Sequence, residues 1–117
     1  MIPVFYIFLG GGLGSVIRYC ISVFLQDLQF PLATLLANFL SCILFAIVFL
    51  FLEKVKPETS IYSFFIIGFC GGLSTFSTFS YETFNLVKSG NLLYAGLNVI
   101  FSVLLCCSVF YLLFRKL

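Results

Sequence analysis

Four long hydrophobic stretches fill almost the whole 117-residue chain and constrain its fold more than any other feature. They cover approximately residues 3–25, 30–52, 59–81 and 92–114, and Arg18 is the one charged residue within them. A helix of about 20 residues crosses the ~30 Å hydrocarbon core of a bilayer, and a segment in lipid must satisfy its own backbone hydrogen bonds. The sequence therefore predicts an all-α integral membrane protein, a single domain with four transmembrane helices.

Composition excludes most other classes of protein. Charged residues make up 9% of the chain, the formal net charge is +2 and histidine is absent, whereas a soluble domain carries roughly 25% charged residues. A soluble enzyme, a disordered tail and a secreted disulfide scaffold are excluded, and we expect no enzyme because no group is placed for covalent chemistry. No basic run is present, which argues against a nucleic-acid partner. The five scattered cysteines are interpreted as small hydrophobic residues.

Positive charges fall unequally on the two sides of the predicted bundle. Lys54, Lys56, Arg115 and Lys116 lie on the side of the two termini, whereas Lys88 lies on the opposite side. Under the positive-inside rule, this bias favours a cytoplasmic location for both termini.

Small residues and one cation interrupt the first stretch. Gly10 and Gly14 form a GxxxG pair, a spacing that is typical of closely packed transmembrane helices. Arg18 follows one turn later in the same stretch. Either its side chain snorkels to the membrane interface, or it faces a water-filled cavity where it concentrates anions. The residues alone leave both interpretations of Arg18 open.

The third stretch departs most from a regular transmembrane helix. Gly71 and Gly72 are followed by a repeat of Ser, Thr and Phe that continues to Tyr81, and Glu82 comes next. Adjacent glycines and hydroxyl residues weaken a helix, so we expect a break near residues 71–76, at mid-membrane. A broken transmembrane helix exposes carbonyl groups that bind cations and N–H groups that bind anions.

Aromatic and polar residues at helical spacing mark further faces. Phe76 and Phe79 share one face of the third stretch and are flanked by hydroxyl groups. Polar or thiol residues recur four apart in the second and fourth stretches: Thr34 and Asn38, then Asn98, Ser102 and Cys106. Each set forms either a hydrogen-bonded helix contact or a polar path, and the spacing does not decide between the two. Glu82 is interpreted first as an interfacial residue.

Together these motifs resemble the CrcB/Fluc family of fluoride channels. The resemblance rests on residues 11–19 (GGLGSVIRY), on the pair Thr34 and Asn38, and on residues 68–82 (GFCGGLSTFSTFSYE). It implies a fluoride-selective channel for the passive export of fluoride across the cell membrane, with fluoride and membrane lipid as its partners. It also implies an antiparallel dimer of four-helix subunits. That dimer is either a dual-topology homodimer or a pair of homologous subunits, and the charge bias keeps both options open.

The resemblance also assigns roles to single residues. A structural sodium ion (Na+) at the dimer interface would bind the backbone carbonyls of Gly71 and Ser74, the latter where the family usually has Thr. The fluoride path would be formed by Asn38, Phe76, Phe79, Thr34, Ser77 and Ser102. Arg18 would lie in the vestibule. Possible gating or polar-track positions are Glu82, Asn98 and Cys106, the last where a hydroxyl is common.

These residue types suit a small, strongly hydrated anion. Asn, Ser and Thr donate hydrogen bonds that replace water, and the positive edge of an aromatic ring can face an anion. A Lys or Arg inside the path would bind fluoride too tightly for conduction. A small multidrug exporter is the alternative, but the first stretch lacks the acidic residue it needs. A non-transporting assembly subunit would leave the Gly-Gly and Ser-Thr-Phe segment unexplained.

Overall fold

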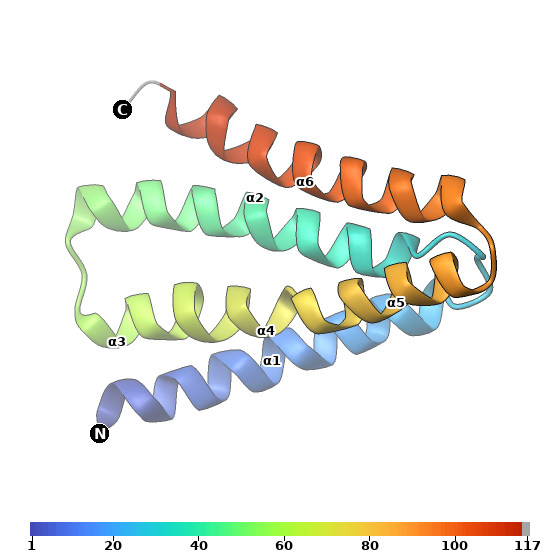
Figure 1. Cartoon of the computed structure of the whole chain (residues 1–117). Coiled ribbons are helices and arrows are strands. Elements are labelled where there is room, and N and C mark those ends of the chain that lie inside the picture. Colours follow the sequence, from blue (N-terminus) through green and yellow to red (C-terminus); the bar gives the residue numbers. More distant parts are fainter. Residues whose placement is uncertain (116–117) are drawn as a thin grey trace.

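The computed structural model describes residues 1–115 and is helical along almost all of them (Figure 1). Its elements are α1 (Ile2–Phe24), α2 (Leu32–Val55), α3 (Thr59–Tyr62), the π-helix η1 (Ser63–Cys70), α4 (Gly71–Leu73), α5 (Phe76–Lys88) and α6 (Leu92–Phe114). Elements α3 to α5 form one bent span, Thr59–Lys88. The predicted all-helical class is confirmed, and each of the four long helices is apolar enough to cross a membrane. Lys116, counted above among the charges, lies outside the described residues.

Short loops separate the spans, and individual residues explain where helices begin and where the chain turns. Pro3 lies in the first turn of α1, where its missing N–H costs no helical hydrogen bond. After α2 the chain turns at Lys56, which adopts a left-handed φ of 49°. Gly90 has a φ of 84° and reverses the chain between α5 and α6, and the Asn91 N–H donates to the Leu86 carbonyl at 2.8 Å. Each span therefore runs antiparallel to the one before it (Figure 1).

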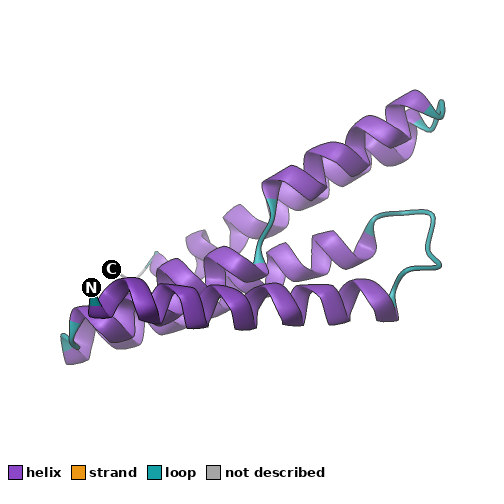
Figure 2. Ribbon diagram, turned by 90° about the horizontal axis from the view of Figure 1, so that it is seen from below, coloured by secondary structure: helices purple, strands orange, loops and turns teal. Residues whose placement is uncertain are grey.

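The spans pack as two pairs. α1 lies along the third span, chiefly against η1 and α4, while α2 packs against α6. α2 also contacts η1 and so joins the two pairs. Figure 2 shows the loop-coloured link inside the third span and the helix that leaves it at an angle. The first half of the third span therefore runs along α1, and the bend directs α5 away from α1.

Four glycines bring α1 and the third span into backbone contact. Gly10 and Gly14 are buried on α1, and Gly68 and Gly72 repeat the spacing of four on the facing helix. A Cβ added at any of these four positions would overlap backbone atoms of the opposite helix. The interpretation of Gly10 and Gly14 as a helix-packing pair is confirmed. Two backbones this close are held by dispersion contacts over many atoms, which is how helices associate in lipid.

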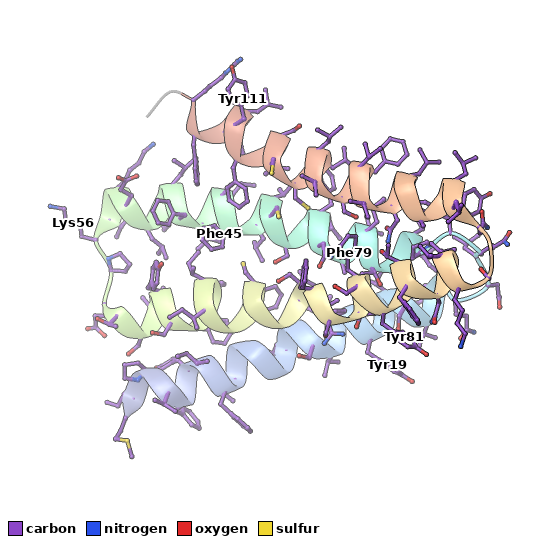
Figure 3. All side chains as sticks on the ribbon, in the orientation of Figure 1. Tyr19, Phe45, Lys56, Phe79, Tyr81 and Tyr111 are labelled. Carbon is purple, nitrogen blue, oxygen red and sulfur yellow. The ribbon has the colours of Figure 1, made fainter. Side chains whose placement is uncertain are left out.

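Aromatic side chains join α2 to α6 and cover much of the outer surface. Phe45 packs against Phe110 and Phe49 against Phe114, with ring centroids 5.5 and 5.6 Å apart. Large apolar side chains also point away from the bundle, and Phe24 is 87% exposed. Figure 3 shows such side chains on all four spans. An apolar exterior of this kind suits lipid or another apolar surface rather than water.

Candidate functional site

The third span leaves helical geometry at two residues. Ser74 (φ −82°, ψ 156°) and Thr75 (φ −152°, ψ 122°) are extended and separate α4 from α5. They follow Gly71 and Gly72 after one intervening residue, Leu73, and fall inside the segment where the sequence predicts a break. Peptide groups that leave a helix in apolar surroundings need other partners. The side chains around this interruption supply several of them.

Thr75 begins the second half of the span as a helix cap. Its side-chain oxygen accepts a hydrogen bond from the Thr78 N–H at 3.2 Å and lies 3.3 Å from the Ser77 hydroxyl. A Thr at this position satisfies one of the N–H groups that the first turn of a helix leaves unpaired. The remaining N–H groups of α5 carry the positive end of its dipole, which favours an anion nearby.

Asn38 on α2 binds the interrupted backbone with both ends of its carboxamide. Its Oδ1 accepts a hydrogen bond from the Thr75 N–H at 2.7 Å, and its Nδ2 donates to the Thr75 carbonyl at 3.2 Å. The N–H and carbonyl groups of one residue that has left the helix are therefore both paired by a single side chain. In the isolated chain, Asn38 acts first as a hydrogen-bonded contact between two spans.

Arg18 points from α1 toward the break. Its Nε donates to the Gly72 carbonyl at 3.1 Å, and the side chain is half-buried. It also lines a cleft of about 800 Å³ together with Thr34, Thr78 and Glu82. The cation therefore lies at a cleft between α1, α2 and α5, and its Nε donates to the backbone.

A second hydrogen bond crosses this cleft from α2 to α5. The Thr34 hydroxyl donates to Glu82 Oε1 at 2.7 Å, while Glu82 Oε2 is buried without a hydrogen-bond partner among the described residues. Thr34 and Glu82 therefore meet as a pair, although the sequence places them on different spans 48 residues apart. The Glu82 carboxyl group faces the protein, not the lipid side of α5.

Phe76 and Phe79 form the expected aromatic pair on α5. Their ring centroids are 5.8 Å apart with planes tilted by 42°. Phe76 is 79% exposed, whereas Phe79 is half-buried. Ser77 is also exposed. The first turn of α5 thus presents a phenyl ring and a hydroxyl group on a face that the described residues leave uncovered.

The polar residues of α6 lie apart from this cleft. Asn98 is 1% exposed and its Nδ2 donates to the Thr83 hydroxyl at 2.9 Å. Its Oδ1 and the Ser102 hydroxyl are buried without partners among the described residues. Cys106, one turn further along α6, is half-buried. These residues form a separate row along α6, and none of them lines the cleft.

Ser41 is a buried contact that no sequence motif marked. Its hydroxyl donates to the Cys70 carbonyl at 2.7 Å, on the other side of the break from Asn38. The signal that could have found it is spacing, because Ser41 follows Asn38 by three residues and shares its helix face. Within residues 1–115, no group of three or more Cys, Asp or Glu side chains is placed to hold a metal ion.

Four apolar spans, a backbone interruption and polar side chains gathered around it define a multi-pass membrane protein with an internal polar site. The chain belongs to the CrcB family: the family described as "CrcB-like protein, Camphor Resistance (CrcB)" matches residues 5–113.

Relatives that carry a functional name agree with one another. The chain is 45% identical over 108 residues to the "Fluoride-specific ion channel FluC" of Coxiella burnetii (strain CbuK_Q154), covering 88% of this chain and 87% of the relative. It is 47% identical over 109 residues to the protein of the same name from Pyrococcus abyssi, covering 89% and 86%. It is 42% identical over 109 residues to the protein of the same name from Flavobacterium psychrophilum, covering 90% of this chain and 88% of the relative.

Proposed function

We propose that this protein is a fluoride-selective channel that lets fluoride leave the cytoplasm passively through the plasma membrane. The observation that carries the proposal is the interruption at Ser74 and Thr75, which opens the first turn of α5 beside Phe76 and Ser77. The names of the relatives above support the choice of ion. The protein transports an ion and performs no covalent chemistry, so it is not an enzyme.

Fluoride must lose water to enter a narrow apolar path, and this loss is costly unless other donors replace the water. The exposed Ser77 hydroxyl, the buried Ser102 hydroxyl and the N-terminal N–H groups of α5 are such donors. Phe76 and Phe79 can turn the positive edges of their rings toward the ion. These groups are neutral, so each holds fluoride weakly enough to release it to the next.

Asn38 and Thr34 complete the proposed path in a different way. In the isolated chain, their side chains are hydrogen-bonded to Thr75 and Glu82. The Asn38 amide nitrogen carries a second hydrogen, which is free to donate to a passing ion. Both residues would therefore contribute mainly by holding the walls of the path. Asn98 and Cys106 continue the polar row of α6 beside Ser102, and Glu82 is the candidate for gating.

Arg18 is proposed as the vestibule cation. Its place on the cleft of about 800 Å³ puts a positive charge where anions enter the protein. Because its Nε is bound to the Gly72 carbonyl, the charge stays at the mouth and does not follow the ion inward. Glu82 across the cleft would limit how strongly that mouth holds any anion.

We also propose that two chains assemble antiparallel, so that the fluoride path runs between them. The exposed Phe76 ring supports this arrangement, because an aromatic box needs walls that the described chain does not supply alone. Gly71 is exposed as well, and a Cβ there would meet nothing within 4 Å. Cysteine-accessibility mapping of the loop at Lys88 tests the orientation: labelling from both membrane sides indicates a dual-topology homodimer, and labelling from one side indicates a paired homologous subunit.

The family resemblance implies a sodium ion, and the backbone at the break fits one. The carbonyls of Cys70, Gly72 and Thr75 accept hydrogen bonds from Ser41, Arg18 and Asn38. Within residues 1–115, none of the hydrogen bonds around the break reaches the carbonyl oxygens of Gly71 and Ser74. Those two carbonyls would hold the ion, since hard cations prefer oxygen ligands. When bound, it would supply positive potential and join two interrupted helices.

Reconstitution tests the proposed function directly. Purified protein in liposomes should release fluoride and retain chloride. The donors of the path replace the water that fluoride loses, and the path is too narrow for the larger chloride ion. Ion-selective electrodes follow both anions in the same preparation, and protein-free liposomes give the background leak. Equal release of the two halides would contradict the proposal.

A further inference from the structure

α2 forms hydrogen bonds to the third span on both sides of the interruption. Asn38 binds Thr75 after the break, and Ser41 binds Cys70 before it. The two α2 residues are three apart and share one helix face. The gap between α4 and α5 is therefore spanned by a rigid piece of another helix.

The Cys70 carbonyl is an unusual acceptor because three donors converge on it. The Ser74 N–H lies 3.0 Å away, the Ser74 hydroxyl 2.9 Å and the Ser41 hydroxyl 2.7 Å. Side-chain donors that share a helical carbonyl weaken the regular hydrogen bond and bend the helix. The last turn before the break is therefore shaped by Ser41 as well as by its own sequence.

Burial prevents water from replacing either partner of the hydrogen bond between Ser41 and Cys70. Ser41 is 4% exposed and Cys70 is 2% exposed, so neither group can exchange its partner for water. A buried hydroxyl without a partner is costly, which holds Ser41 to this one carbonyl. Ala37, four residues earlier on the same face of α2, is fully buried as well.

We propose that Ser41 is a positioning residue of the channel. By holding the Cys70 carbonyl toward α2, it fixes the direction of the next peptide and leaves the Gly71 carbonyl facing the open side of the break. Ser41 touches no ion itself. This inference rests on the proposed function, since the Gly71 carbonyl that it positions is one of the two assigned there to the sodium ion.

The test compares three single substitutions in the full chain. Ser41→Ala removes the donor, Ser41→Thr keeps it, and Ser108→Ala removes an exposed hydroxyl that donates within its own helix to the Leu104 carbonyl. Fluoride efflux from liposomes should fall roughly two- to tenfold in Ser41→Ala, as expected for the loss of one buried hydrogen bond. Ser41→Thr and Ser108→Ala should stay near the parent rate.

Infrared spectroscopy of protein carrying ¹³C at the cysteine carbonyls gives a readout that is independent of transport. The Ser41→Ala minus parent difference spectrum should show one carbonyl band at higher frequency, because the Cys70 carbonyl has lost one donor. An unshifted band, or parental efflux in Ser41→Ala, would overturn the positioning role. So would a Ser41→Thr variant as slow as Ser41→Ala with the parental band, since packing would then explain the loss. If the parent passes no fluoride, the proposed function fails, and the band shift still decides the contact.

Discussion

The two halves of the third span differ sharply in what surrounds them. In the half before the break, Ser63, Ile66, Gly68, Cys70 and Leu73 are all buried, and α1 contacts it backbone to backbone. In the half after the break, α5 buries only Leu86 among its thirteen residues. The first half is packed within the chain, whereas the second presents its first turn outward. A channel needs both, because a rigid scaffold must carry a face that is free to meet an ion.

The largest effect is expected where the first half meets α1. Gly14→Ala places a Cβ against the facing backbone, where no side chain can move aside. We expect the free energy of unfolding to fall by roughly 1–3 kcal/mol, the usual cost of overpacking, or the variant to aggregate in detergent. Thermal unfolding and size-exclusion chromatography in detergent measure the outcome.

Gly12→Ala is the matched control on the same helix. A Cβ at Gly12 meets nothing within 4 Å, so the substitution should be neutral or should stabilise α1 by up to about 1 kcal/mol through helix propensity. Equal damage from both variants would show that α1 is not held by backbone contact with the third span.

A smaller effect is expected at the exposed turn of α5. Phe76→Ile and Phe79→Ile remove aromatic edges while keeping apolar bulk, so the fold should persist and fluoride efflux should slow about two- to tenfold, in line with the 0.5–1.5 kcal/mol that aromatic contacts contribute. Phe8→Ile, at a position on α1 that is 75% exposed, is the control and should conduct like the parent. If the two α5 variants also conduct like the parent, the pair is ordinary packing.

The smallest effect is expected at the cleft mouth. Arg18→Gln removes the charge that concentrates anions, so fluoride efflux should fall by a factor of about two or three at low ionic strength and less at high salt. Lys54→Gln removes the same charge at the far end of α2 and serves as control. A loss that is independent of salt would assign the role of Arg18 to its bond with the Gly72 carbonyl instead.

Much of the architecture was predictable because it depends on local pattern alone. Hydrophobic stretches long enough to cross lipid predicted four helices, and residues 1–115 contain four candidate membrane spans. The Gly-Gly and Ser-Thr-Phe segment predicted the interruption, because glycine and hydroxyl residues weaken any helix regardless of its neighbours. Gly10 and Gly14 were recognisable as packing positions because their GxxxG spacing is itself a local pattern. The π-helical winding of Ser63–Cys70 had no such signal in the sequence.

The partners of the polar side chains were not predictable, because they come from helices distant in the chain. Spacing put Thr34 and Asn38 on one face but did not pair the first with Glu82 or the second with Thr75. The sequence left both interpretations of Arg18 open and gave no sign that its Nε donates to the Gly72 carbonyl. Ser41 carried no motif at all, and its importance depends on the position of a carbonyl 29 residues away.

By itself, the sequence determined that the chain is a four-helix membrane protein, where its third helix breaks and which family it resembles. The first two follow from hydrophobicity and helix propensity, which act over one to a few turns, and the resemblance follows from local motifs such as residues 68–82. Only the tertiary structure decided which side chains pair the peptide groups freed by the break and which carbonyls stay open. A hydrogen bond needs two groups within about 3 Å, and helix packing alone brings groups from different spans that close.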